Sequence, residues 1–279
     1  MKKSLLAIAL LAATGAFAQS VTLYGVADVA YNNDVKKDNT GKKTETSDVI
    51  TNGLATSRLG VKGDREITNG LKANFMMEFE VDQSSDTGII KTRIGTVGLT
   101  GGFGGVSFGR RNTLLKDIEA GFDANDGPTA AGYLGDNARE SRRNDVITYT
   151  TPVFSGFSAD VQVGFGSVKK ETSSAGVVST TNNGKTGDST SVALNYANGP
   201  FAVKFGTETV KSFSKSFKVG DTEVISAVSP VTTDLKQNVL GASYDLGMAK
   251  LFFVNTNAKQ GAGTTEAKFD TNNLGVRIP

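Results

Sequence analysis

The stretch Phe157–Phe165 reads F-S-A-D-V-Q-V-G-F, with apolar residues at its odd positions and polar residues or Gly at its even positions. The same period of two runs through Leu71–Val81, Val192–Tyr196 and Phe201–Gly206. Strict alternation of this kind is typical of β-strands with one apolar and one polar face, and helical spacing fits none of these segments. They therefore predict an all-β protein.

Working outward from these runs, the whole chain divides into about twelve alternating segments. We place them at 21–33, 54–66, 71–83, 90–101, 105–111, 144–151, 157–168, 189–197, 201–213, 236–245, 248–259 and 268–278. Some are joined by short turns, and others by long polar stretches at 34–53, 111–143, 169–188 and 214–236.

The length of the segments and the pattern of their connections favour a membrane barrel. A tilted membrane strand needs roughly 9–11 residues, whereas strands in soluble sandwiches average about 5–6. Short turns that alternate with long loops are typical of outer-membrane barrels. We therefore expect a transmembrane antiparallel β-barrel whose apolar faces meet lipid and whose polar faces line a wet lumen.

The composition excludes several classes of function. The chain contains no His, no Cys and no Trp. Without His and Cys, neither a Ser-His nor a Cys-His pair nor an ordinary zinc site can form, so we expect no enzyme, no metal and no cofactor. The 30 basic and 28 acidic residues nearly cancel, which argues against a nucleic-acid partner.

The N-terminus carries an export signal. Lys2 and Lys3 precede the apolar run Leu5–Ala13, and Ala16–Ala18 matches a cleavage site, so residues 1–18 are predicted to be a signal peptide. The remaining residues, 19–279, form the expected barrel. Removal of the two lysines leaves 30 − 2 = 28 basic residues against 28 acidic ones.

Charged residues on the predicted strands are the candidate site. An Arg that faces lipid at mid-depth costs about 2–4 kcal/mol, so the arginines should face the lumen. The candidates on the basic wall are Arg58, Arg93, Arg110, Arg111, Arg142 and Arg143. Strict alternation directs Arg111 inward and Arg110 outward, together with Val106 and Phe108.

The stretch between the fifth and sixth predicted strands supplies the candidate acidic side of a constriction, namely Asp117, Glu119, Asp123 and Asp126. If this stretch folds inward, its carboxylates face the arginines across a narrow gap, and opposed charges of this kind set ion selectivity. The spacing is equally consistent with a solvated external loop.

Several short segments, in order, carry a resemblance to a known family. They are Ser20–Gly25 (SVTLYG), Ser57–Gly63 (SRLGVKG), Asn69–Ala73 (NGLKA), Phe103–Arg110 (FGGVSFGR), Tyr149–Phe157 (YTTPVFSGF) and Gly275–Pro279 (GVRIP). With these residues the chain resembles Gram-negative general porins of the trimeric kind, especially those of beta-proteobacteria.

The resemblance implies a 16-stranded barrel that forms a homotrimer in the outer membrane of a Gram-negative bacterium, in contact with lipid and lipopolysaccharide. It also implies passive diffusion of small hydrophilic solutes and ions, with the third loop folded into the lumen. Arg58, Arg93 and Arg142 match the family's wall arginines, and Arg110 or Arg111 matches another near the base of the loop. The chain departs from some relatives at Val26, where they carry a basic residue.

The C-terminus also departs from the family. Family members end in an aromatic residue on a sixteenth strand, whereas this chain stops at Ile278–Pro279 on the twelfth predicted strand. We therefore predict a barrel that is incomplete at the C-terminus and lacks about four strands. A genuine barrel of twelve strands is the alternative.

Other functions compete with a non-specific channel. One is a substrate-preferring channel for organic anions or phosphate. Another, from a different class, is a secreted soluble β-sandwich or adhesin.

Overall fold

The computed structural model describes residues 20–53, 55–83, 91–124, 141–166, 187–213, 218–219, 222–223, 233–261 and 266–278. The predicted signal peptide at 1–18 lies outside these residues. Contacts divide the chain into two compact units, one ending at Ser107 and the other beginning at Phe108.

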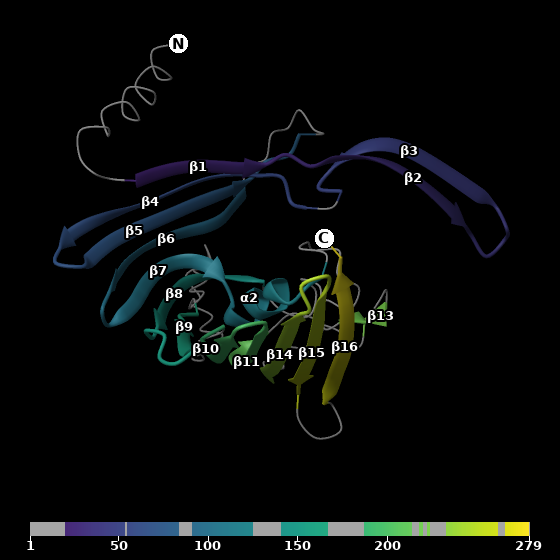
Figure 1. Ribbon diagram of the computed structural model, residues 1–279. Coiled ribbons are helices and arrows are strands. Elements are labelled where there is room, and N and C mark those ends of the chain that lie inside the picture. Colours follow the sequence, from purple (N-terminus) through teal and green to yellow (C-terminus); the bar gives the residue numbers. More distant parts are fainter. Residues whose placement is uncertain are drawn as a thin grey trace, which may run out of the picture. The chain divides into compact units, whose positions relative to one another are not determined.

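The first unit consists of antiparallel strands (Figure 1). They are β1 (Ser20–Val26), β2 (Val29–Lys37), β3 (Lys43–Thr51), β4 (Arg58–Thr68), β5 (Leu71–Glu80) and β6 (Lys91–Gly101), followed by β7 (Gly104–Asn112), which runs on into the second unit. Strand β1 pairs with β4, so the order is β1-β4-β5-β6-β7, and β2 and β3 form a separate hairpin.

The second unit consists of antiparallel strands and one helix, α2 (Leu114–Gly121). Its long strands are β8 (Arg142–Thr150), β9 (Phe157–Gly164), β10 (Ser189–Asn198), β11 (Phe201–Phe213), β14 (Thr233–Asp245), β15 (Lys250–Gln260) and β16 (Ala267–Arg277). Two short strands, β12 (Lys218–Val219) and β13 (Thr222–Glu223), form a separate two-stranded sheet. The sheet has twelve strands in all, as predicted. In the described part of the chain, no helix is long and apolar enough to cross a membrane.

The start of the chain differs from the prediction. The strand expected at 21–33 is broken, because the Asp28 carboxylate accepts hydrogen bonds from the backbone N–H groups of Gly53 at 2.7 Å and Ala55 at 2.8 Å. The region 34–53, expected to be a loop, contains most of the β2–β3 hairpin. Strand β3 is exposed on both faces over most of its length, so its sequence lacks the alternation that marks the other strands.

The turn of that hairpin is stabilised by Asp38. Its carboxylate accepts from the Thr40 hydroxyl at 2.6 Å and from the backbone N–H groups of Thr40 and Lys42. These bonds favour the ionised form, so the Thr40 hydroxyl above all holds the pKa of Asp38 below its usual value.

The predicted alternation of faces is confirmed in the second unit. Leu194 on β10 is 59% exposed and Phe157 on β9 also 59%, whereas Gln162 on β9 is 0% exposed and Ala193 on β10 is 2% exposed. We call the face of Leu194 and Phe157 the apolar face, and the opposite one, which carries α2, the inner face.

The inner face is not uniformly polar, which differs from expectation. Beneath α2 it carries Val239, Phe252 and Val254, which form one buried cluster with Leu115, Ile118 and Phe122 of the helix segment. Burial of such side chains is worth about 1.5–3 kcal/mol each. The second unit therefore has a hydrophobic core on its inner face in addition to the exposed apolar side chains on the other.

Candidate functional site: charge clusters on the strands

In the first unit, a cluster joins three strands through Glu78 of β5. Its Oε1 accepts from Arg93 Nε of β6 at 2.6 Å, and its Oε2 accepts from the Tyr24 hydroxyl of β1 at 3.0 Å. Nη1 of Arg93 also lies 3.7 Å from Oε2 of Glu80. The Arg93 and Glu78 side chains are each only 10% exposed. A charge-assisted bond at this distance is among the strong ones, so the guanidinium is fixed in place.

A β-bulge directs Arg93 to this face. Glu78 pairs with Ile94 and Phe79 with Thr92, so Arg93 is an extra residue in the ladder. Val97 on the same strand is 59% exposed on the opposite face, and strict alternation from Val97 would send Arg93 there too. The bulge turns the Arg93 side chain to the face that carries Glu78. Bulges near functional sites often redirect a side chain in this way.

Arg58 opens β4 on the same polar face. It pairs in register with Glu80 of β5 and with Val26 of β1. Arg58 and Arg93 therefore share this face with Glu78 and Glu80. Glu78 and Glu80 were not among the predicted site residues, although both lie on the polar side of the Leu71–Val81 run. Only the strand register reveals that they adjoin the arginines.

In the second unit, the corresponding cluster is centred on Glu208 of β11. Its Oε1 accepts from Arg143 Nε of β8 at 3.2 Å and from the Ser191 hydroxyl of β10 at 3.1 Å, and its Oε2 accepts from Gln237 Nε2 of β14 at 3.4 Å. The Glu208 side chain is 0% exposed and that of Arg143 5%. Glu208 is a second carboxylate that the sequence patterns did not single out.

The other predicted arginines lie near the base of α2. Arg111 Nη2 is 3.3 Å from Oδ2 of Asp117, whose Oδ1 also accepts from Asn112. Arg110 Nη1 donates to Asn144 Oδ1 at 2.7 Å in an exposed position. Arg142 is partly buried at the start of β8. The structure thus brings Asp117 and Arg111 together.

The remaining acidic candidates have different surroundings. Glu119 is 4% exposed, and its Oε1 accepts from the Thr256 hydroxyl of β15 at 3.0 Å. Asp123 contributes its backbone carbonyl, which accepts from Arg277 Nη2 of β16 at 3.1 Å. Asp126 lies outside the described residues. Three of the acidic candidates therefore lie on or just after α2, which packs against β10, β11 and β14 (Figure 1).

Local sequence explains why α2 forms inside a stretch that was predicted to be a loop. Thr113 is its N-cap, and the Thr113 hydroxyl accepts from the Lys116 backbone N–H at 3.2 Å. Leu114, Leu115 and Ile118 then supply one buried face. This cap and short apolar face are visible in the sequence, but they are easily missed within a long polar stretch.

We expect Thr113→Ala to destabilise the folded protein by about 1 kcal/mol, because the N-cap hydroxyl satisfies an otherwise unpaired backbone donor. Thr113→Ser keeps the hydroxyl and is the matched control, with a change of a few tenths of a kcal/mol. Heat or urea unfolding in detergent measures both. Equal stability of the Ala variant and the wild type would contradict the capping role.

Comparison with known proteins agrees with the long antiparallel strands. A family model described as Gram-negative porin matches residues 4–279. The chain belongs to the Gram-negative porin family. It is an outer-membrane protein of a Gram-negative bacterium, and its fold is the transmembrane antiparallel β-barrel of porins.

Individual relatives support this membership. Outer membrane porin protein 32 of Delftia acidovorans is 35% identical over 268 residues, which cover 90% of this chain. The major outer membrane protein P.IB of Neisseria meningitidis serogroup B (strain ATCC BAA-335 / MC58) is 33% identical over 210 residues, or 74% of this chain. This porin chain spans 68% of the Delftia protein and 58% of the Neisseria protein.

Solved structures show the same fold. The anion-selective porin from Comamonas acidovorans is 27% identical, with a TM-score of 0.72 over 94% of this chain and 74% of that one. OmpF of Salmonella typhi has a TM-score of 0.60 at 18% identity, over 92% of this chain and 73% of that one, a likeness that concerns the fold alone.

Proposed function

We propose that this porin forms a water-filled channel for passive diffusion of small hydrophilic solutes and ions. The observation that carries the proposal is the contrast between the two faces of long strands. Strands such as β4, β10 and β15 have 10 or 11 residues, which is the length that crosses a bilayer at a tilt. Their exposed apolar side chains suit lipid, and the charge clusters on the opposite face suit a wet lumen.

Liposome swelling tests this function directly. Vesicles that contain the purified protein are placed in isotonic solutions of sugars of increasing size. A channel of this kind gives swelling rates that fall with solute size and do not saturate with concentration. Vesicles that swell no faster than protein-free vesicles would contradict the proposal.

A channel that prefers anions is the second candidate. Six arginines lie on or beside the strands of the proposed wall, and the Comamonas porin to which the chain is similar is described as anion-selective. However, Glu78, Glu80 and Glu208 lie beside three of those arginines, so much of the basic charge is already balanced. A reversal potential measured across a KCl gradient distinguishes a strong anion preference from a weak one.

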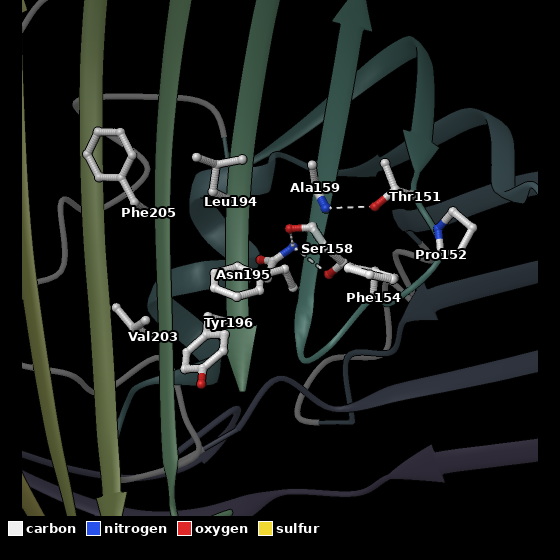
Figure 2. A pocket seen from close by; sticks show the side chains of 11 residues that line it. Thr151, Pro152, Phe154, Ser158, Ala159, Leu194, Asn195, Tyr196, Val203 and Phe205 are labelled. Atoms are coloured by element: carbon white, nitrogen blue, oxygen red, sulfur yellow. Dashed lines mark hydrogen bonds between the residues drawn. The ribbon is translucent and has the colours of Figure 1, made fainter. Parts of the chain in front are cut away.

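The proposed partners are outer-membrane lipid, lipopolysaccharide and two further copies of the chain in a homotrimer. A groove of about 540 Å³ on the apolar face supports contact with acyl chains. Figure 2 shows Phe154, Leu194 and Phe205 among its lining residues. One polar atom among its lining residues, Thr151 Oγ1, accepts a hydrogen bond from Ala159 N at 2.9 Å.

Aromatic side chains beside this groove support an interfacial position for the short turns. The Phe157 and Tyr196 rings lie 4.4 Å apart, and the Tyr196 and Phe201 rings 6.3 Å apart, next to the turn that joins β10 and β11. Rings of this kind gather at the edges of the hydrocarbon layer in membrane barrels.

We expect Leu194→Arg to destabilise the membrane-inserted protein by about 2–4 kcal/mol, because Leu194 is at the middle of β10 on the proposed lipid face. Asn195→Arg is the matched control, since position 195 faces the opposite side, near Asp160. Unfolding by urea in lipid vesicles measures both. Equal losses at the two positions would contradict the assignment of the faces.

The proposed function includes no catalysis. The clusters instead present fixed charges on rigid strands, which is what a selective aqueous passage requires.

A further inference from the structure

Helix α2 and the residues that follow it lie close to three glycines of the strands. A Cβ atom at Gly206 of β11 would lie 2.6 Å from Ile118 Cδ1. A Cβ at Gly241 of β14 would collide with the Phe122 ring, and one at Gly275 of β16 with Ala124. A side chain at Gly241 or Gly275 would therefore overlap the residues that follow the helix, and one at Gly206 would displace the end of the Ile118 side chain. We call Gly206, Gly241 and Gly275 the glycine seat.

The strand register places the glycine seat along one line. Gly206 pairs with Val239, two residues before Gly241 on the same strand. Gly241 pairs with Val254 of β15, and Phe252, two residues before Val254, pairs with Gly275. The glycines therefore lie on one face, in a diagonal row across β11, β14 and β16. The helix segment contacts them in chain order, first Ile118, then Phe122 and then Ala124.

Backbone conformation does not explain these glycines. Among the residues that the structure describes, nine other glycines have a positive φ, which favours Gly, but none of the three seat glycines is among them. Any residue can adopt their backbone geometry, and Gly in the interior of a strand is otherwise unfavourable because it adds flexibility and packs nothing. Close approach of another segment is a physical reason for Gly at a strand interior, and the contacts with the helix segment supply it here.

Further contacts hold the end of the helix segment against this row. Arg277 of β16 donates to the backbone carbonyls of Asp123 at 3.1 Å and Ala124 at 2.9 Å. Its guanidinium also lies 5.1 Å from the centre of the Phe252 ring, between the second and third seat glycines. The segment is therefore attached to the strands by bonds as well as by apolar packing.

From these contacts we propose that the glycine seat sets the width of the pore. By removing side chains beneath α2, Gly206, Gly241 and Gly275 let the helix lie directly on the wall, and this leaves the rest of the cross-section open to solutes. A side chain at any of the three positions lifts the helix off the wall towards the lumen. The inference rests on the proposed channel function and adds the residues that determine its size.

The test uses single-channel conductance of the full chain in planar bilayers. Gly241→Leu is expected to lower the conductance by about 1.5- to 2-fold, because conduction follows the narrowest cross-section. The matched control is Ala242→Leu, since residue 242 points to the opposite face and should leave the conductance unchanged. In the double variant Gly241→Leu with Phe122→Ala, the new side chain fits the space of the lost ring, and the conductance should return towards the wild-type value.

The outcomes separate this inference from the proposed function. A folded Gly241→Leu protein with wild-type conductance overturns the glycine seat, and so does an equal loss in Ala242→Leu. Silent bilayers with the wild-type protein overturn the channel function itself. If Gly241→Leu does not fold, Gly241→Ala replaces it in the same experiment, because it adds only a methyl group. The expected loss of conductance is then smaller, and Phe122→Ala should again reverse it.

Discussion

Arg143→Ala is expected to destabilise the porin by about 3–5 kcal/mol, because it leaves the Glu208 carboxylate buried without its cation. Glu208 is fully buried, and its other partners, Ser191 and Gln237, are neutral. Neutral donors cannot replace a guanidinium as a counterion, and an unpaired buried charge is among the costliest defects in a protein. The loss should appear as a lower midpoint in heat or urea unfolding in detergent.

Two further variants make the result specific to the buried charge. In Arg143→Met with Glu208→Gln, both charges are removed, and most of the stability should return. Arg110→Ala, by contrast, removes a half-buried arginine whose bond to Asn144 is exposed and is expected to cost less than about 1 kcal/mol. If the double variant were as unstable as Arg143→Ala, the account of an unpaired carboxylate would be wrong.

The second large effect is expected on ion selectivity. Arg58 and Arg93 share the polar face of the first unit with Glu78 and Glu80, so these four residues have a formal charge of zero. Arg58→Ala with Arg93→Ala changes that charge to −2. We expect the ratio of cation to anion permeability to rise by about threefold or more, since charges that line a pore act on ions at close range.

Reversal potentials across a KCl gradient measure this change. Glu78→Gln with Glu80→Gln is the opposite variant and should shift selectivity towards anions. Lys36→Ala, on the exposed β2–β3 hairpin where the Lys36 side chain is 82% exposed, is the control and should have little effect. An unchanged reversal potential in the double Arg variant would show that Arg58 and Arg93 do not line the conducting path.

Much of the fold was predictable because alternation is a local property. Runs such as Phe157–Phe165 show which side chains share a face without any knowledge of their neighbours. The hairpin of β2 and β3 was not predicted, because β3 is exposed on both faces over most of its length and so shows no alternation. The break at Asp28 depends on bonds to Gly53 and Ala55, far along the chain.

The candidate site was predictable only on its basic side. The cost of an arginine in lipid indicates that Arg93 faces inward, but the bulge that achieves this appears only in the pairing of β5 with β6. The partners Glu78 and Glu208 depend on strand register over sequence separations of 15 and 65 residues. The seat of α2 on Gly206 and Gly241 likewise arises from tertiary packing, which no local pattern in the sequence reveals.

The central claim is that a wet passage runs along the charged faces of these strands. Single-channel conductance of the purified wild-type protein in planar bilayers, measured in electrolytes of increasing bulk conductivity, tests that claim most directly. A water-filled channel gives discrete current steps whose size rises in proportion to the conductivity of the solution. Bilayers that stay silent at every salt concentration, with protein shown to be inserted, would contradict it.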